Sequence, residues 1–215
     1  MSTTVAPPSA AARPAPKQAR SRATRRRILE AAVACLVERG YAGASTTEIG
    51  RRAGVSQGAL FKHFSSKLDL LGAAVAHLFA QMVHDYERAF SELAGQSPGD
   101  RLDGAIRLLR RTFAEPRLQA AFELYVAART DAALSRTIAP VLRAHRDNLR
   151  EVARSLFPTE AARTHDFDAF VDIVLDAMQG AALGAVVLPD PTREQMALEA
   201  LERWARTRLG VEETC

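Results

Sequence analysis

Hydrogen-bonding and cationic side chains gather on one face of a short helix that the sequence predicts near residue 60. The outward positions of this helix are Ser56, Gln57, Ala59, Lys62 and His63. Hydroxyl, amide, ammonium and imidazole groups can hydrogen-bond to base edges and to phosphate oxygens. These residue types are therefore suited to a nucleic-acid surface rather than to a protein core.

Residues for other kinds of chemistry do not form a recognisable site. His77 and His84 lie seven residues apart on one predicted helix face, but no third ligand follows at a spacing typical of zinc sites. The sequence has no glycine-rich phosphate loop, no Gly-x-Ser-x-Gly motif and no His-Glu-x-x-His motif. We therefore predict that the protein is not an enzyme, with no catalytic residues, no metal site and no cofactor.

Two short helices joined by a tight turn must position the polar face. Ser45-Thr46-Thr47-Glu48 has the pattern of a capping box, in which the serine oxygen accepts from the backbone near the glutamate and the glutamate reaches back. Gly50 is small enough for a helix crossing, Gly54 tolerates a positive φ in the turn, and Ser56 is a good cap for the second helix. The sequence thus predicts a helix-turn-helix over residues 45–64.

The rest of the chain is also predicted to be helical, which gives an all-α fold of about nine helices. Apolar residues at three- and four-residue steps predict an earlier helix over residues 24–39 that stops at Gly40. Glycine and proline breaks separate the later helices, and Pro140 should kink one of them or mark its start. These helices are expected at about residues 67–94, 100–114, 116–130, 132–156, 166–188 and 191–209. Residues 1–20 are rich in proline and small residues and are expected to be disordered.

The charge of the chain is divided unevenly along its length. Residues 1–80 hold 12 of the 29 lysines and arginines but only four of the 25 acidic residues, so the remainder is negative overall. A polyanion is therefore the expected partner of the first third. The acidic remainder argues against a protein that lies on a membrane surface. The basic residues of segment 1–20 would either enter a minor groove or only solubilise the chain.

The cellular compartment follows from the cysteines and the apolar runs. Cys35 and Cys215 are the two cysteines and make no disulfide framework. The best apolar run, residues 181–188, is far shorter than a membrane span, and the N-terminus lacks the features of a secretory signal. We expect a cytoplasmic protein without a membrane partner.

Several separated motifs in residues 22–79 resemble the N-terminal domain of tetracycline-repressor (TetR) family regulators. They are Thr-Arg-Arg-Arg-Ile-Leu-Glu-Ala-Ala at 24–32, Glu-Arg-Gly-Tyr at 38–41 and the run from Ser45 to Leu71. The resemblance implies a DNA-binding domain at residues 21–81 and a helical effector-binding and dimerisation domain at 82–215. It further implies a homodimer on a palindromic double-stranded DNA operator, most often a repressor, which a small-molecule effector releases. An activator and a non-specific architectural protein are the alternatives within the DNA-binding class.

The resemblance also assigns roles to the first half of the motif. Thr46 would bind a phosphate through its hydroxyl and the helix N-terminus. Thr47 and Gln57 would reach base edges, although glutamine also serves as a phosphate contact. Gly58 would let the recognition helix approach the sugar-phosphate wall.

The roles implied for the second half include one departure from the family pattern. Phe61 stands where a tyrosine is common, so it keeps a ring for sugar or thymine-methyl contact but lacks the phenolic donor. Lys62 replaces another frequent aromatic and supplies a point charge. His63 and Lys67 would hold backbone phosphates.

The C-terminal helices contain a candidate dimer interface and a candidate ligand pocket, which the sequence defines less clearly. A stripe of apolar and small residues on the helix at 166–188, together with the last helix, suits a four-helix bundle between two subunits. The alternative is that the stripe packs inside one subunit. The interface candidates are Phe170, Val174, Ala177, Gly180, Ala181, Gly184, Leu201 and Trp204. A mostly apolar effector would contact Phe113, Phe122, Tyr125, Leu142 and Met178, unless these residues are only core.

Overall fold

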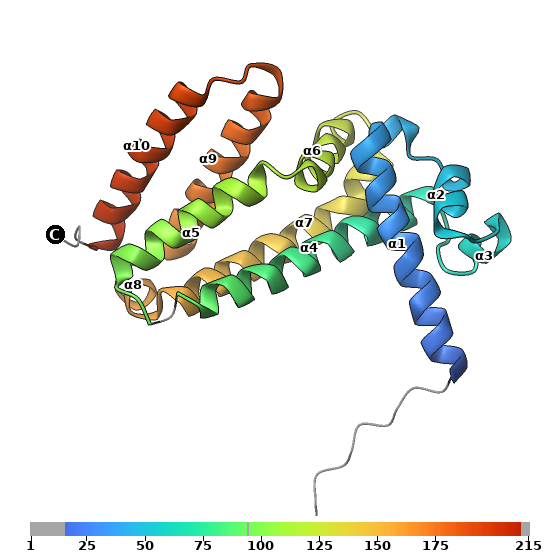
Figure 1. Ribbon diagram of the computed structural model, residues 1–215, viewed down its shortest axis with the longest axis horizontal. Coiled ribbons are helices and arrows are strands. Elements are labelled where there is room, and N and C mark those ends of the chain that lie inside the picture. Colours follow the sequence, from blue (N-terminus) through green and yellow to red (C-terminus); the bar gives the residue numbers. More distant parts are fainter. Residues whose placement is uncertain (1–15, 94, 212–215) are drawn as a thin grey trace, which may run out of the picture.

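The computed structural model describes residues 16–93 and 95–211, and its regular elements there are all α-helices. They are α1 (Pro16–Gly43), α2 (Thr46–Ala53), α3 (Gln57–Phe61), α4 (Lys67–Ser91), α5 (Pro98–Phe113), α6 (Pro116–Ala128), α7 (Ala132–Leu156), α8 (Pro158–Arg163), α9 (Phe167–Val187) and α10 (Pro191–Leu209) (Figure 1). The predicted all-α class is confirmed. The additional helix is α8, whose initial proline looks like a break in the sequence but is well tolerated at the first helical position.

Helix α1 begins earlier than the sequence suggested. Residues 16–20 are helical, whereas segment 1–20 was expected to be disordered, and residues 1–15 lie outside the described part of the chain. Lysine, arginine, glutamine and alanine are strong helix formers, so a helix held by packing further along can extend backwards through them. Its regular part ends as predicted at Gly40, where φ is 65°.

Two long helices, α4 and α7, lie side by side through the centre of the molecule (Figure 1). Helix α1 packs on α4 and α6, and it carries α2 at one end of the molecule. Helices α5, α9 and α10 pack together at the other end. The buried side chains form one continuous apolar cluster from Ile28 in α1 to Leu209 in α10. The same central helix, α4, thus reaches from the helix-turn-helix into the C-terminal half.

Helix α7 passes through Pro140 without ending. The sequence left two possibilities, a kink or the true start of the helix, and the helix begins eight residues earlier, after Asp131. The Asp131 side chain caps this start by accepting from the backbone N–H groups of Ala133 and Leu134 at 3.0 and 2.9 Å. Pro140 is therefore an interior residue of α7.

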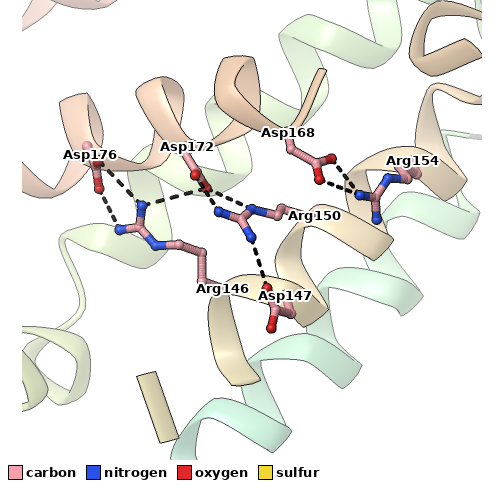
Figure 2. Close-up of polar contacts among 7 residues, drawn as sticks. All are labelled: Arg146, Asp147, Arg150, Arg154, Asp168, Asp172 and Asp176. Atoms are coloured by element: carbon pink, nitrogen blue, oxygen red, sulfur yellow. Dashed lines mark hydrogen bonds and ion pairs between the residues drawn. The ribbon is translucent and has the colours of Figure 1, made fainter. Parts of the chain in front are cut away.

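A row of ion pairs joins α9 to α7 (Figure 2). Asp168 pairs with Arg154, Asp172 with Arg150, and Asp176 with Arg146, with shortest N–O distances of 2.5, 2.5 and 2.7 Å. By length and composition alone, α9 is apolar enough to cross a membrane. Three carboxylates paired along one face of α9 would be costly in lipid. The apolar composition of α9 is therefore not evidence that it spans a membrane.

Candidate nucleic-acid interface

Local hydrogen bonds define the two helices of the motif. The Ser45 hydroxyl accepts from the backbone N–H of Glu48 at 3.2 Å, and the Ser56 hydroxyl accepts from that of Ala59 at 3.2 Å. Gly54 ends α2 with a φ of 63°, a conformation that favours glycine. Both predicted caps and the predicted turn glycine are confirmed, and they fix where the polar face of α3 points.

The crossing of α2 and α3 depends on Gly50. This residue is buried, and a Cβ atom built on it would lie 3.3 Å from the Val55 carbonyl oxygen and 3.8 Å from Leu60 Cδ1. Since Ile49 and Leu60 are fully buried beside it, a larger residue would push the helices apart. The expected small residue at the crossing is confirmed.

Glu48 does not complete the capping box that its spacing predicted. Its carboxylate instead accepts from Arg51 at 2.8 and 2.9 Å and from Arg52 at 2.9 Å. The hydrogen bonds from Arg51 and then Arg52 lower the pKa of Glu48 to about 2, because they stabilise its ionised form. Arg52 also bonds to Glu38 of α1. Two arginines compete better for a carboxylate than one backbone N–H does. Arg52 also joins α2 to α1 through Glu38.

Of the polar face predicted from the sequence, Ser56 and Lys62 are exposed, whereas Gln57, Ala59 and His63 are half-buried. Thr47, Phe61 and Lys62 are exposed, and the Phe61 ring remains 48% accessible, which is unusual for a phenylalanine. The Gln57 amide nitrogen donates to the Thr47 hydroxyl at 3.1 Å, so the two predicted base-reading side chains lie together. A Cβ atom on Gly58 would meet nothing within 4 Å, which leaves the backbone of α3 approachable.

The predicted phosphate-binding residues flank this face. Thr46 is the first residue of α2 and is half-buried, and Ser56 is exposed at the start of α3. His63 lies in the turn after α3, half-buried. Lys67 begins α4, where its ammonium group lies 5.0 Å from the centre of the Tyr41 ring and donates to the Tyr41 carbonyl at 3.4 Å. These groups can donate hydrogen bonds or positive charge to an anion on the α3 side.

Contacts around Tyr41 tie the motif to the C-terminal half, and the sequence gave no sign of them. The Tyr41 backbone N–H donates to Glu123 of α6 at 2.9 Å, and its hydroxyl donates to Asp131 at 3.1 Å. Burial raises the pKa of the Tyr41 phenol, and the hydrogen bond to Asp131 raises it further. Glu123 and Asp131 lie 82 and 90 residues after Tyr41 in the sequence, so no local sequence pattern could predict these contacts.

The residues predicted for the dimer interface divide into two groups. Phe170 and Val174 are buried inside the chain, which corresponds to the alternative that this part of the stripe packs within one subunit. Ala177, Gly180, Ala181 and Trp204 are exposed, and Gly184 and Leu201 are half-buried. The exposed apolar surface includes further residues of α9 and α10 and of the segment between them: Ile173, Leu183, Val186, Val187, Leu188 and Met196. Phe170 and Val174 face inward because that side of α9 packs on α5 and α7.

The residues predicted for a ligand pocket do not lie around one cavity. Phe113 stacks on Phe122 at a centroid distance of 5.9 Å, and Phe122 meets Tyr125 edge to face at 5.6 Å. These rings are largely core, the alternative that the sequence left open. Phe113 and Met178 line an open cleft of about 530 Å³ between α5, α9 and α10. Leu142 is half-buried on α7.

A different, smaller cavity lies inside the C-terminal half. It measures about 70 Å³ and is lined by apolar side chains of α4, α5, α7 and α9, among them Phe90, Ile106, Val152, Phe170 and Val174. An open cleft of about 580 Å³ adjoins it and shares Phe90 and Val152. Sequence reasoning missed this pair of cavities, because the inward faces of four helices look like ordinary core positions.

Comparisons with known proteins agree with this geometry. The sequence profile of the bacterial regulatory proteins of the tetR family matches residues 28–74, which span α2 and α3. An uncharacterized HTH-type transcriptional regulator of Mycobacterium tuberculosis is 32% identical over 185 residues, which are 86% of this chain and 94% of that protein. The HTH-type transcriptional repressor KstR of Mycolicibacterium smegmatis is 34% identical over 90 residues, 42% of this chain and 43% of that protein.

The fold itself also has solved counterparts. The crystal structure of a putative TetR-family transcriptional regulator from Mesorhizobium loti superimposes with a TM-score of 0.66 at 22% identity, covering 89% of this chain and 98% of that one. The relatives are transcriptional regulators, which confirms the prediction of a regulator rather than an enzyme.

Proposed function

The chain belongs to the tetR family of bacterial regulatory proteins, and we propose that it is a repressor that binds a palindromic operator as a homodimer and leaves it when a small apolar effector binds. Regulation of transcription through DNA binding is common to its relatives. KstR, a relative over 90 residues, is itself named a repressor, which supports repression here. A soluble DNA-binding regulator acts in the cytoplasm, and this is the compartment that we propose.

The exposed polar face of α2 and α3 is the observation that carries the proposal. Thr47 and Gln57 share a hydrogen bond at the exposed end of the motif, where they can reach base edges in a major groove. Lys62 and Lys67 supply positive charge on the flanks for phosphates, and the His63 ring can donate a hydrogen bond to one. Arg51 and Arg52, by contrast, are held by Glu48 and contribute mainly to the domain itself.

The homodimer is supported by the three different sides of α9. One side is paired with α7 through Asp168, Asp172 and Asp176 (Figure 2), and a second side is buried in the chain. The third side exposes apolar residues such as Ile173, which is 51% accessible, and Val187, which is 85% accessible. Large contiguous apolar surfaces on a soluble protein mark interaction sites. The same side of a second copy provides a self-complementary partner under two-fold symmetry.

The internal cavity supports an apolar effector. Its walls offer almost no polar atoms, so a charged ligand would lose hydration without compensation there. A hydrocarbon body can enter from the adjoining cleft past Phe90 and Val152, which line both spaces. Because the cavity touches α4, which also begins next to the motif at Lys67, occupancy and DNA binding can be coupled through one helix.

Trp204 provides a direct test of the effector site. It is the one tryptophan of the chain and stacks on the cavity-lining Phe170 at 5.4 Å. We expect a series of n-alkanols to change Trp204 emission saturably and to weaken operator binding. Val174→Phe, which fills the cavity, should abolish both responses, whereas Val126→Phe on the exposed surface of α6 should not. Alkanol responses that persist in the filled variant would contradict this site.

Selection of binding sequences tests the operator. Purified protein is used to enrich duplexes from a random pool, and the enriched sequence is then footprinted. A two-fold symmetric sequence with half-sites about one helical turn apart is the expected result for a homodimer with two recognition helices. Enrichment of an asymmetric site, or of no sequence above the starting pool, would contradict the proposal. Reporter expression that rises on deletion of the protein distinguishes repression from activation.

A further inference from the structure

A basic helical arm precedes the part of the chain that the family profile matches. We define the arm as residues 16–27, the stretch of α1 before Ile28, which is the first fully buried residue. The family profile begins at residue 28. At 1.5 Å per residue these 12 residues make a rod of about 18 Å. The arm therefore lies outside the segment that the family profile matches.

The arm is strongly charged and has few contacts of its own. Residues 17–27 include six basic residues and no acidic one. Its five arginines, at positions 20, 22, 25, 26 and 27, are all exposed. Arg26 approaches Glu30 at 3.5 Å, but both side chains are at least half exposed, so this pair contributes little. Like charges four residues apart, such as Arg22 and Arg26, destabilise a free helix. A polyanion that neutralises them would stabilise the arm.

The position of the arm relative to α3 indicates which polyanion. The Arg25 guanidinium lies over the ring of Phe64 at 5.0 Å, and Phe64 directly follows Lys62 and His63. The arm thus leaves the domain beside the proposed phosphate contacts at the end of α3. Figure 1 shows it projecting past α2 and α3, away from α9 and α10 at the other end of the molecule. DNA bound by α3 would pass close to this rod.

We propose that the arm binds the phosphate backbone of the duplex that flanks each half-site and so lengthens the contact by about five base pairs per subunit. This inference rests on the proposed operator binding and adds a second, sequence-independent surface to it. Arginine suits the role because its planar guanidinium matches phosphate oxygens and remains charged at all physiological pH values. The arm contributes affinity and salt dependence, while α3 contributes sequence preference.

Binding to duplexes of two lengths distinguishes the contribution of the arm from that of the helix-turn-helix. One duplex contains only the selected palindrome, and the other adds eight base pairs of arbitrary sequence on each side. We expect the full chain to bind the longer duplex roughly tenfold or more tightly at 0.1 M salt. A triple variant, Arg20→Gln, Arg22→Gln and Arg26→Gln, should bind both lengths alike. Its log–log salt slope on the long duplex should be shallower by about one unit for each arginine that contacts a phosphate.

Matched controls exclude a general effect of charge or folding. Glutamine and arginine have similar helix propensities, so circular dichroism should be unchanged. Replacement of Arg88, Arg107 and Arg163 by glutamine removes the same charge from exposed sites in the C-terminal half and should preserve the length dependence. The corresponding triple lysine variant of the arm retains the charge, so it should retain most of the dependence of affinity on duplex length.

The outcomes distinguish the arm from the operator function. Specific binding by the full chain with equal affinity for both lengths would overturn the arm and leave operator binding intact. An equal loss on both lengths in the triple glutamine variant would also overturn it, because the arginines would then act within the core contact. Failure of the full chain to bind any selected duplex would overturn both inferences. Tighter binding of anionic vesicles than of the long duplex would assign the arm to a membrane and refute the proposal.

Discussion

Gln57 of α3 donates its amide N–H to the hydroxyl of Thr47 in α2 at 3.1 Å, so each proposed base-reading residue orients the other. The Gln57 amide oxygen is buried and has no hydrogen-bond partner among the described residues. An unsatisfied acceptor of this kind is costly unless a ligand supplies a donor. An adenine supplies such a donor through its N6 amino group, while its N7 accepts, once the Gln57 side chain turns outward into the groove. We therefore expect the two residues to read one base of the operator together.

Removal of either member of this pair should alter sequence preference in a coupled way. We expect Gln57→Ala to cost about 1–3 kcal/mol of discrimination at one operator position. Thr47→Val keeps the shape of the side chain but releases the Gln57 amide, so it should relax the preference at the same position. A double-mutant cycle measured on operator binding should show a coupling energy above about 0.5 kcal/mol. Strictly additive effects would mean that the two residues read DNA independently.

Lys62 should contribute to affinity without contributing to sequence preference. Its ammonium group is exposed at the end of α3, so Lys62→Ala should weaken binding to all duplexes alike. The log–log salt slope should become shallower by about one unit per bound subunit. Arg88→Ala is the control, because it removes an equally exposed charge at the far end of α4. A salt slope unchanged by Lys62→Ala would exclude this residue from the phosphate contacts.

The motif was predictable from sequence because its determinants are local. Ser45, Gly54 and Ser56 act within three or four residues of their own positions, through caps and a left-handed turn. The prediction for Glu48 failed for the opposite reason. Its arginine partners at positions 51 and 52 are close in sequence, but Arg52 is also held by Glu38 of a different helix. Local spacing does not reveal which of two competing partners tertiary packing favours.

Gly58 offers a substitution that separates stability from DNA binding. Its Cβ position is empty to 4 Å and its backbone is helical, so Gly58→Ala should raise the free energy of unfolding by up to about 1 kcal/mol. If α3 approaches the sugar-phosphate wall here, the added methyl group should weaken operator binding by roughly 1–2 kcal/mol, the order of one lost base contact. Gly54→Ala is the comparison, because its φ of 63° makes any side chain strained, and it should lower stability. Unchanged operator affinity in Gly58→Ala would show that α3 does not approach DNA at this residue.

The dimer surface should be sensitive to charge at Ile173. This side chain is 51% exposed in the isolated chain, and Ile173→Asp would bury a carboxylate in an apolar interface. We expect the variant to sediment as a monomer and to bind a palindrome no better than a single half-site. Val126→Asp introduces the same charge at an exposed valine of α6 and should remain dimeric. A dimeric Ile173→Asp protein would place the interface elsewhere.

The C-terminal half was harder to predict, because its faces are assigned by packing over long separations. The sequence showed an apolar stripe on α9 but did not show that Phe170 and Val174 on it are buried within the chain. The aspartates at positions 168, 172 and 176 lie on one face at four-residue spacing, a signal that was present in the sequence. Only their arginine partners on α7, 14 to 30 residues away, show that this face is covered within the chain.

The imidazole of His145 should make stability depend on pH. It stacks on Phe79 with a centroid distance of 3.9 Å and an angle of 7°, and its Nδ1 atom is buried without a partner among the described residues. Burial, with a smaller effect of Arg146, lowers the pKa of His145 to about 4. The unfolded chain, with a histidine pKa near 6.5, binds a proton between pH 6.5 and 4 that the folded chain does not. The stabilisation is therefore complete above pH 6.5 and is lost as the pH falls to 4.

Urea unfolding at pH 7.5 and 5.0 measures this effect. The decrease in unfolding free energy between the two pH values should be about 2 kcal/mol smaller in His145→Phe than in the unchanged protein, because phenylalanine keeps the stack on Phe79 but cannot titrate. His84→Gln, at an exposed position of α4, should retain the original decrease. All samples are compared at one protein concentration, since the stability of a homodimer depends on it. Parallel pH profiles for His145→Phe and the unchanged protein would show that this imidazole is protonated equally in the folded and unfolded states.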